Sequence, residues 1–348
     1  MDLVSDLKNF QIAQEGQSKI ILKNPIESLG VCLPLGFPKL PEGWIVETES
    51  FISEAVGFKS ETAGFKYETA GFKSGDKKTK LFSITCRENL WKNSCSLIIL
   101  HGLGEHCGRY LHLPHFMQSS FGAVFSYDQR GHGRSEGIRG HAEHFDVLAQ
   151  DAALFVNQIS AKLSKHFGAS EIHVLGHSLG AHVALRMMFL NPNLPVKTLT
   201  LTSPFLAIKT KVPFYKKILA NTLSTIWGSL QLDTALDVHT LSHDPEVVTA
   251  YQTDKLVHSK MTPRFYTTML EAMRNTLHRE SGLKPPVQFL VPLLDALVNP
   301  ETSIRFYKNL KHREKRLKTY PNFFHEPVNE IGKEIVFEDI VSWVKQYS

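Results

Sequence analysis

The sequence predicts an α/β fold in which helices flank a mostly parallel central sheet. Three short apolar runs, Cys95–Leu100, Ala123–Tyr127 and residues 172–175, have the length and composition of buried strands. Each run leads into a polar turn punctuated by glycine, and the third turn opens a helical stretch. Buried strands that alternate with turns and helices are typical of a parallel sheet covered on both faces.

The third turn, residues 176–180, has the sequence Gly-His-Ser-Leu-Gly. Between a strand and a helix, Gly-x-Ser-x-Gly is the pattern of a nucleophile elbow, in which a sharp bend exposes the serine hydroxyl above a helix N-terminus. The bend brings neighbouring backbones close together, so a side chain at either glycine would collide with them. Because so short a pattern also occurs by chance, its function has to be judged from the rest of the chain.

Two further turns supply that context. The strand Cys95–Leu100 leads into His-Gly-Leu-Gly-Glu-His-Cys-Gly-Arg-Tyr at residues 101–110. The strand Ala123–Tyr127 leads into Asp-Gln-Arg-Gly-His-Gly at residues 128–133. Together with the elbow, these turns resemble those of the monoacylglycerol lipase and lysophospholipase family of α/β-hydrolases. The resemblance extends from about residue 72 to the C-terminus and implies the α/β-hydrolase fold, with a helical cap inserted after the sixth strand.

The resemblance implies a catalytic triad of Ser178, Asp295 and His325. In this family the acid follows a late strand, here residues 286–292, and the histidine follows one more strand, here residues 317–320. The order of serine, acid and histidine along the chain is the one that the fold requires.

The backbone N–H groups of Leu103 and Leu179 are predicted to form the oxyanion hole. A tetrahedral oxyanion needs donors that are in place before its charge develops, and both residues lie in the expected turns. Asp128 and His132 precede the elbow, so we expect them to stabilise their own turn rather than to act in the triad. His177 adjoins the nucleophile on a sharp bend, and we expect it to point elsewhere and to be structural.

A serine at the elbow predicts hydrolysis of a carboxylic ester. His325 would accept the proton of Ser178 as general base while Asp295 orients the imidazole, and water would resolve the acyl-enzyme at Ser178. The resemblance implies that the acyl group comes from a monoacyl lipid, either a monoacylglycerol or a lysophospholipid. Two alternatives stay open: another ester hydrolase, acyltransferase or peptidase-like relative with the same triad, and a non-catalytic relative that binds an acyl ligand.

Residues 204–284 are predicted to form the helical cap, because they are too many for a simple connection between two strands of the core. The α/β-hydrolase core would then comprise residues 71–203 and 285–348. The cap segment is rich in large apolar side chains, which suits an acyl chain. It also carries a mixture of aromatic and basic residues, which indicates either transient contact with a membrane surface or a solvated helix face. These residues are Lys209, Lys211, Phe214, Tyr215, Lys216 and Lys217.

The overall composition excludes several classes of protein. A chain of 348 residues with 42% hydrophobic content can bury one large core together with a cap. The net charge of +5, without a run of Lys and Arg interleaved with aromatic residues, argues against a nucleic-acid partner. The first residues resemble no signal peptide, and no stretch approaches about 20 apolar residues, so we expect a cytoplasmic protein that is at most peripheral to a membrane. The oligomeric state is left open.

No motif for a cofactor or metal is present, and we expect the enzyme to need neither. The four cysteines lack zinc-like spacing and are expected to be free thiols, namely Cys32, Cys86, Cys95 and Cys107. Cys107 follows the oxyanion turn. If it lines the cleft, a bulky thiol reagent attached to it would slow the enzyme.

Residues 1–70 are predicted to be an N-terminal extension that contains most of a seven-residue tandem repeat, at about residues 55–75. The three copies share the tripeptide Gly-Phe-Lys. The third copy is predicted to turn at residues 74–77 and to pair with residues 79–84 as the first hairpin of the sheet. Nearly identical copies specify strand register weakly, and we expect the first two to form a loop without a catalytic role.

Overall fold

The structure is a computed structural model that describes residues 10–12, 20–22, 28–38, 40–54, 78–209, 214–234 and 236–348. The tandem repeat lies outside the described residues, so the hypothesis that its first two copies form a non-catalytic loop is not addressed by them. Among the described residues, no helix is long and apolar enough to cross a membrane.

A ten-stranded sheet forms the centre of the molecule, in the order β1-β2-β3-β4-β6-β5-β7-β8-β11-β12. In this order, the six strands β6, β5, β7, β8, β11 and β12 are parallel to their neighbours. Strands β1 to β4 pair antiparallel with one another, and β4 pairs antiparallel with β6. The predicted fold class, a mostly parallel sheet flanked by helices, is therefore confirmed. The strands are β1 (Phe10–Ile12), β2 (Ile20–Leu22), β3 (Trp44–Ser53), β4 (Thr79–Glu88), β5 (Cys95–Leu100), β6 (Ala123–Tyr127), β7 (Glu171–His177), β8 (Thr198–Thr202), β11 (Val287–Pro292) and β12 (Lys315–Tyr320).

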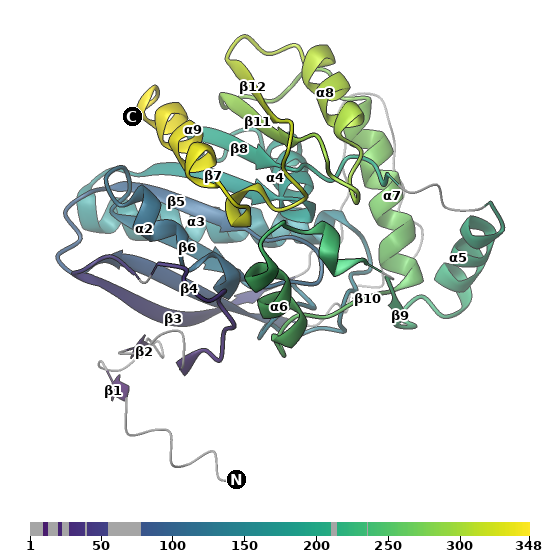
Figure 1. Cartoon of the computed structure of the whole chain (residues 1–348), viewed down its shortest axis with the longest axis horizontal. Helices are drawn as coiled ribbons and strands as arrows, with labels where there is room; N and C mark the ends of the chain where they lie inside the picture. The colour runs from purple at the N-terminus through teal and green to yellow at the C-terminus, as the bar shows by residue number, and fades with distance from the viewer. Residues whose placement is uncertain are drawn as a thin grey trace.

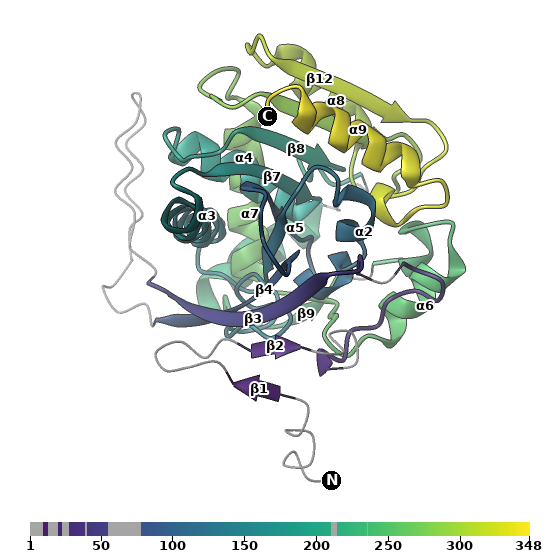
Figure 2. The ribbon, with the colours of Figure 1, turned by 90° about the vertical axis from the view of Figure 1, so that its left-hand side faces the viewer.

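Helices cover both faces of the sheet, as Figures 1 and 2 show. One face packs against α3, α4 and α8, and the other against α2 and α9. Their bounds are α2 (Leu113–Met117), α3 (Asp146–Phe167), α4 (Leu179–Leu190), α8 (Pro300–Asn309) and α9 (Glu334–Lys345), with short 3-10 helices η2 (Cys107–Tyr110) and η4 (Pro327–Asn329).

Strand β5 shows why the sheet is buried on both sides. Leu97 and Ile99 belong to the apolar cluster that includes α2 and α9, whereas Ile98 and Leu100 belong to the cluster that includes α3 and α4. Successive side chains of a strand point to opposite faces, so an uninterrupted apolar run requires a cover on each face.

The prediction for the first hairpin was wrong. Strand β4 pairs with β3 over ten residue pairs, from Ser53 with Thr79 to Trp44 with Glu88. Its other edge is also occupied, because Ser83 pairs with Tyr127 of β6 and Phe82 donates its N–H to Ser135 Oγ. Residues 79–84 therefore have no edge left for the third copy of the repeat. The sheet extends into residues 44–53, which the sequence analysis assigned to an N-terminal extension.

Between β8 and β11 the chain leaves the sheet and forms the elements of the region predicted as a cap (Figure 1). They are α5 (Phe214–Ile226), β9 (Leu232–Asp233), η3 (Val238–Thr240), α6 (Pro245–Thr253), β10 (Lys260–Met261) and α7 (Pro263–Leu277). Helix α7 packs on the core, where its buried Phe265 and Met269 join the cluster of α3 and α4. His182 of α4 and Thr276 of α7 are joined by a hydrogen bond of 3.1 Å.

Three helices in this half of the chain begin with the same local signal, a capping residue followed by proline. Asp244, Thr262 and Asn299 each accept a hydrogen bond from a backbone N–H of the first turn of α6, α7 and α8. Proline fits the next position because the N–H that it lacks would have no partner within the helix. The sequence thus sets where these helices start.

Candidate active site

Ser178 lies at the bend between β7 and α4, with a backbone φ of +51°. This left-handed conformation is strained for a residue with a side chain, and it is held by hydrogen bonds such as the one of 2.9 Å from Ser178 N–H to the Thr202 carbonyl. Both glycines of the motif are required sterically. A Cβ at Gly180 would collide with the Leu100 carbonyl oxygen, and one at Gly176 would lie 2.6 Å from the Cα atom of Ala181.

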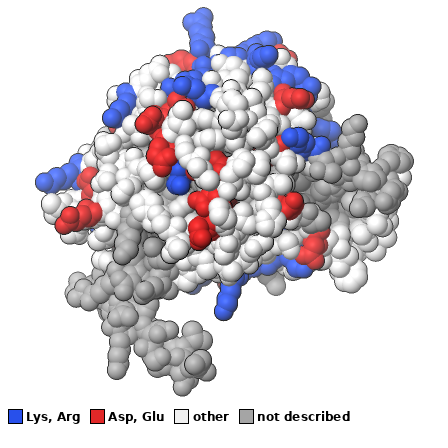
Figure 3. All heavy atoms as spheres, in the orientation of Figure 1, with Lys and Arg blue, Asp and Glu red and all other residues white. Residues whose placement is uncertain are grey.

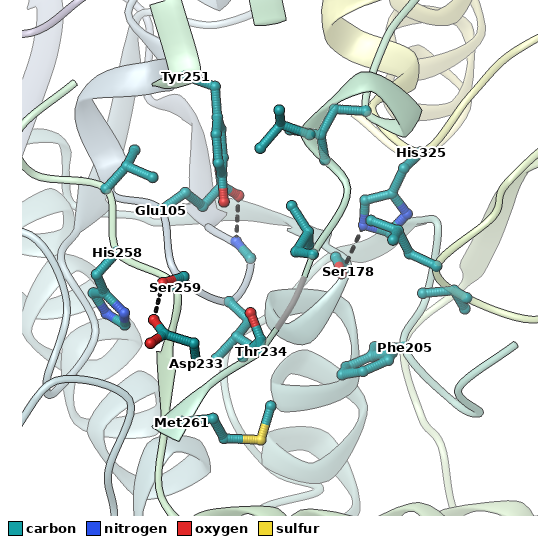
Figure 4. Close-up of a pocket in the computed structure, with 18 of the residues that line it drawn as sticks. Glu105, Ser178, Phe205, Asp233, Thr234, Tyr251, His258, Ser259, Met261 and His325 are labelled. Atoms are coloured by element: carbon teal, nitrogen blue, oxygen red, sulfur yellow. Dashed lines mark hydrogen bonds between the residues drawn. The ribbon is translucent and has the colours of Figure 1, made fainter. Parts of the chain in front are cut away.

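The structure brings the three predicted triad residues together. His325 Nε2 lies 3.0 Å from Ser178 Oγ, and His325 Nδ1 lies 2.7 Å from Asp295 Oδ2 (Figure 4 shows the serine and the histidine). The other carboxylate oxygen, Asp295 Oδ1, accepts the backbone N–H groups of Leu297 and Val298 at 2.8 and 2.9 Å. This is the arrangement of nucleophile, base and orienting acid that serine acyl transfer needs.

Burial and charge act in opposite directions on the acid and the base. Burial alone would lower the pKa of His325, but the Asp295 carboxylate raises it above its ordinary value of 6.5. Burial alone would raise the pKa of Asp295, but His325 and the two backbone N–H donors lower it below its ordinary value. Asp295 therefore stays ionised near neutral pH, and His325 is a stronger base than a free histidine.

Both predicted oxyanion residues belong to segments next to the serine: Leu179 follows it in the chain and Leu103 lines the same cavity. Leu179 is the first residue of α4, where backbone N–H groups have no acceptor within the helix. Leu103 lines the cavity that contains Ser178. The turn before it is fixed by Glu105, whose Oε1 accepts the Gly102 N–H. Their assignment to the oxyanion hole stays a prediction.

Asp128 stabilises its own turn, as the sequence predicted. Its carboxylate accepts the backbone N–H of Cys107 at 2.8 Å and that of Arg134 at 2.7 Å, so it joins two loops. His132 is buried, and its Nδ1 lies 3.0 Å from the carbonyl oxygen of Arg130 in the same turn.

His177 is closer to the reacting groups than the sequence predicted. Its ring lines the cavity, and the ring centroid lies 5.0 Å from that of His325. Its Nδ1 is hydrogen bonded to Thr202 Oγ1 at 3.0 Å. Burial is the main cause that lowers the pKa of His177 to about 4, with a further contribution from His325. Since His177 is neutral near neutral pH, His325 is the histidine of this pair that takes up a proton more readily.

Glu105, Arg109 and Glu326 form a buried ionic cluster that was not predicted from the sequence. Arg109 donates to Glu105 Oε2 and makes two hydrogen bonds of 2.8 Å to the Glu326 carboxylate. Tyr110 donates its hydroxyl to Glu105 Oε1 at 2.7 Å. Glu105 and Arg109 have opposite charges and are only four residues apart, which was the visible signal for their pairing. Nothing local indicated the third member, which follows His325 directly.

Cys107 does not line the cavity, so the condition attached to its prediction is not met. Its side chain is buried, in a loop whose backbone is held by Asp128. Burial, followed by the charge of Asp128, raises the pKa of the thiol well above its ordinary value. A thiol reagent therefore meets neither an accessible nor a readily ionised sulfur at this position.

Ser178 opens into a cavity of about 710 Å³. Figure 4 shows Glu105, Tyr251, His258 and Asp233 on one side of the serine and Phe205 with His325 on the other. The apolar part of the lining consists of residues from the core loops and the cap, which include Leu103, Phe205, Ile208, Leu232, Leu236, Val238, Leu241, Val257, Met261, Leu297 and Val298. The cavity has the volume and composition of a site for a small, largely apolar ligand.

Comparison with known proteins identifies the family. Residues 92–332 match the model of the family described as serine aminopeptidase, S33, which covers more than half of the chain. The chain belongs to this family. It is a serine hydrolase of the α/β-hydrolase fold, and the resemblance stated from its motifs is confirmed.

Individual relatives agree with this assignment. The monoacylglycerol lipase of Mycolicibacterium smegmatis is 27% identical over 249 residues, 71% of this chain and 87% of that protein. An uncharacterized abhydrolase domain-containing protein of Dictyostelium discoideum is 29% identical over 256 residues; these cover 73% of this chain and 27% of that protein. The crystal structure of Paleococcus ferrophilus monoacylglycerol lipase superposes with a TM-score of 0.65 at 29% identity, over 73% of this chain and 95% of that one.

Proposed function

We propose that this protein is a carboxylic-ester hydrolase that releases a fatty acid from a monoacyl lipid through an acyl-enzyme at Ser178. The observation that carries the proposal is the position of the Ser178–His325–Asp295 array at the wall of a cavity lined largely by apolar side chains. Relatives named monoacylglycerol lipase support the same substrate class.

The geometry accounts for each step of the reaction. His325 Nε2 accepts the proton of Ser178 Oγ as the oxygen attacks the ester carbonyl, and Asp295 stabilises the imidazolium that forms. The N–H groups of Leu103 and Leu179 would donate to the oxyanion. His325 then returns the proton to the departing alcohol, and it later activates the water that cleaves the acyl-enzyme.

The charge of the cavity favours an uncharged head group. Among the described lining residues none is Lys or Arg, and four are acidic, namely Glu105, Asp233, Asp254 and Glu326; Asp233 is neutralised by an ion pair with Lys260. Arg109 is shared between two of these carboxylates, so that group keeps a net negative charge. A phosphate would be repelled there, whereas glycerol hydroxyls can donate hydrogen bonds to carboxylates. We therefore favour a monoacylglycerol over a lysophospholipid.

Part of the cap is suited to contact with a lipid surface. Helix α5 and the residue after it carry four large apolar side chains that are at least half exposed, namely Ile218, Leu219, Ile226 and Trp227. In Figure 3 the described atoms at the right-hand end of the molecule, where α5 lies, are mostly uncharged. Exposed apolar groups next to a lipase cavity would bring the enzyme to membranes or micelles that hold its substrate.

Initial-rate hydrolysis tests the proposal. The purified protein and its Ser178→Ala variant are given p-nitrophenyl esters of increasing chain length, then 1-monoacylglycerol and lysophosphatidylcholine with the same acyl chain. We expect rates that rise from short to medium chains, a preference of at least tenfold for the monoacylglycerol, and no activity in the variant. Activity that survives in Ser178→Ala contradicts the acyl-enzyme, and a preference for lysophosphatidylcholine contradicts the charge argument.

A further inference from the structure

We propose that Glu330 is a positioning residue, whose buried carboxylate holds the loop of His325 against cap residues 241–243. The position of the general base then depends on the cap that lines the substrate cavity. This inference rests on the proposed function, since it gives His325 the role of base.

The Glu330 carboxylate connects its own loop to the residue before His325 and to a cap segment that is distant in the sequence. Its Oε1 accepts the backbone N–H groups of His243 and Ile331 at 2.9 and 2.8 Å and lies 3.2 Å from Ser242 Oγ. Its Oε2 accepts the N–H of Phe324 at 3.1 Å and lies 3.0 Å from His243 Nδ1. Phe324 immediately precedes His325, so one carboxylate joins the cap to the residue next to the base.

The same two segments are joined by backbone hydrogen bonds around His325. Glu326 N–H donates to the Leu241 carbonyl at 2.9 Å, and His325 N–H points to the Thr240 carbonyl at 3.4 Å. On the core side, Ser203 Oγ donates to the His325 carbonyl at 2.6 Å. The side chain of Leu241 lines the cavity, so a substrate that displaces Leu241 also moves the acceptor of the Glu326 N–H.

Ring stacking strengthens the same junction. The imidazole of His243 lies over the ring of Phe324, with a centroid distance of 3.6 Å and an angle of 23°. Glu330 is 1% exposed, so water does not reach its carboxylate oxygens, and their hydrogen bonds come from these protein partners. A carboxylate only accepts hydrogen bonds, and three of its partners are backbone N–H groups that only donate. An amide at this position would place its own N–H groups against those donors.

The test compares Glu330→Gln with a matched control, Glu334→Gln, which makes the same change at an exposed site four residues later. Active sites are counted by the end-point of labelling with a fluorophosphonate, so that misfolded protein is not scored. For Glu330→Gln we expect kcat per labelled site to fall 10- to 100-fold and KM to change less than threefold, because a small displacement of a base costs rate rather than binding. The control should match wild type.

Two readouts distinguish positioning from a purely structural role. In Glu330→Gln the acid limb of kcat/KM should move to lower pH, because a His325 that drifts from Asp295 loses the carboxylate that raises its pKa. The rate constant of fluorophosphonate labelling should fall with kcat. Ser242→Ala leaves the three backbone donors in place and should lower kcat only two- to fivefold. This milder variant keeps the test possible if Glu330→Gln does not fold.

The outcomes separate the two proposals. Wild type that neither labels nor hydrolyses esters contradicts the proposed function. Wild type that does both, with variants that keep its kcat and its acid limb and lose only thermal stability, overturns the role of Glu330 alone. A lower kcat with a shifted acid limb and an unchanged control supports it.

Discussion

Arg109 and Glu326 are 217 positions apart in the sequence, yet they form a bidentate ion pair with two hydrogen bonds of 2.8 Å. Arg109 belongs to the loop after the oxyanion turn, and Glu326 follows the histidine of the triad. Through Glu105, the same guanidinium is linked to the Gly102 N–H. A single buried cation therefore ties the turn that contains Leu103, a predicted oxyanion residue, to the loop of His325, the predicted base.

Glu105→Gln should destabilise the protein in a pH-dependent way. Burial alone would raise the pKa of Glu105, but Arg109, His177 and His101 lower it to about 2 from its ordinary 4.5. A carboxyl group whose pKa is lower in the folded than in the unfolded protein stabilises the fold at pH values above its unfolded pKa. This stabilisation is lost as the pH falls from 4.5 towards 2.

Urea unfolding of wild type and Glu105→Gln at pH 7, 5 and 3 measures this effect. The gap in free energy of unfolding should be about 2 kcal/mol at pH 7 and pH 5, since the buried hydrogen bonds of a charged group are lost, and smaller at pH 3. Glu338→Gln, at an exposed site on α9, serves as the control and should show no gap. A gap of the same size at every pH would assign the loss to packing rather than to charge.

Asp295→Asn should lower kcat by roughly 10³- to 10⁴-fold without unfolding the protein, because the amide no longer selects the correct imidazole tautomer. The pH profile provides a second test. Wild-type kcat/KM should rise with pH through an apparent pKa above 6.5, since the base must lose its proton and Asp295 raises its pKa. In the variant this limb should lie at lower pH. A profile identical to wild type would show that Asp295 does not act on His325.

The double variant Ile226→Ser and Trp227→Ser should bind lipid vesicles at least about tenfold more weakly, since both side chains are more than half exposed at the end of α5. Hydrolysis of p-nitrophenyl acetate in solution should be unchanged, because neither residue contributes to the cavity lining. Co-sedimentation with phosphatidylcholine vesicles measures the binding. Leu90→Ser is a control of similar exposure outside the cap, at 74% against 77% for Ile226. An equal loss in the control would rule out a specific contact.

Thiol reagents should modify Cys32 in the native protein and leave the other three cysteines unmodified, since Cys32 is half-buried and the others are buried. Burial also raises the pKa of Cys86 to about 12 and that of Cys95 to about 11. Peptide mapping after treatment with and without denaturant identifies the modified sites. Labelling of Cys107 before unfolding would mean that its loop opens in solution.

The elements that the sequence predicted well are those with local causes. The bend at Ser178 follows from two glycines beside a strand and a helix, and the close contacts at Gly176 and Gly180 show that other residues would not fit. The starts of α6, α7 and α8 were not predicted, but they have a local cause of the same kind, a capping residue and a proline. Asp295 and His325 were predicted from the family resemblance, and they meet because each follows a strand and parallel strands place their following loops at one edge of the sheet.

The predictions that failed required knowledge of distant partners. Residues 79–84 could pair with any extended segment of suitable pattern. The nearby repeat was the simplest partner to predict, because pairing with it closes only a short loop and so costs little chain entropy. The structure instead pairs them with β3, which offers ten matched residues. Cys107 shows the same limit, because its exposure depends on how the loop around Asp128 packs.

The sequence by itself determined the fold class and the bend that carries Ser178, because strand runs and glycine turns are local patterns, and its motifs pointed to Asp295 and His325 through the family resemblance. Only the tertiary structure decided which groups surround them. The ion pairs of Arg109 and the hydrogen bonds of Glu330 join segments far apart in the chain. A buried charge or polar group is stable only with its partners in place, and those partners come together only when the core and the cap are packed.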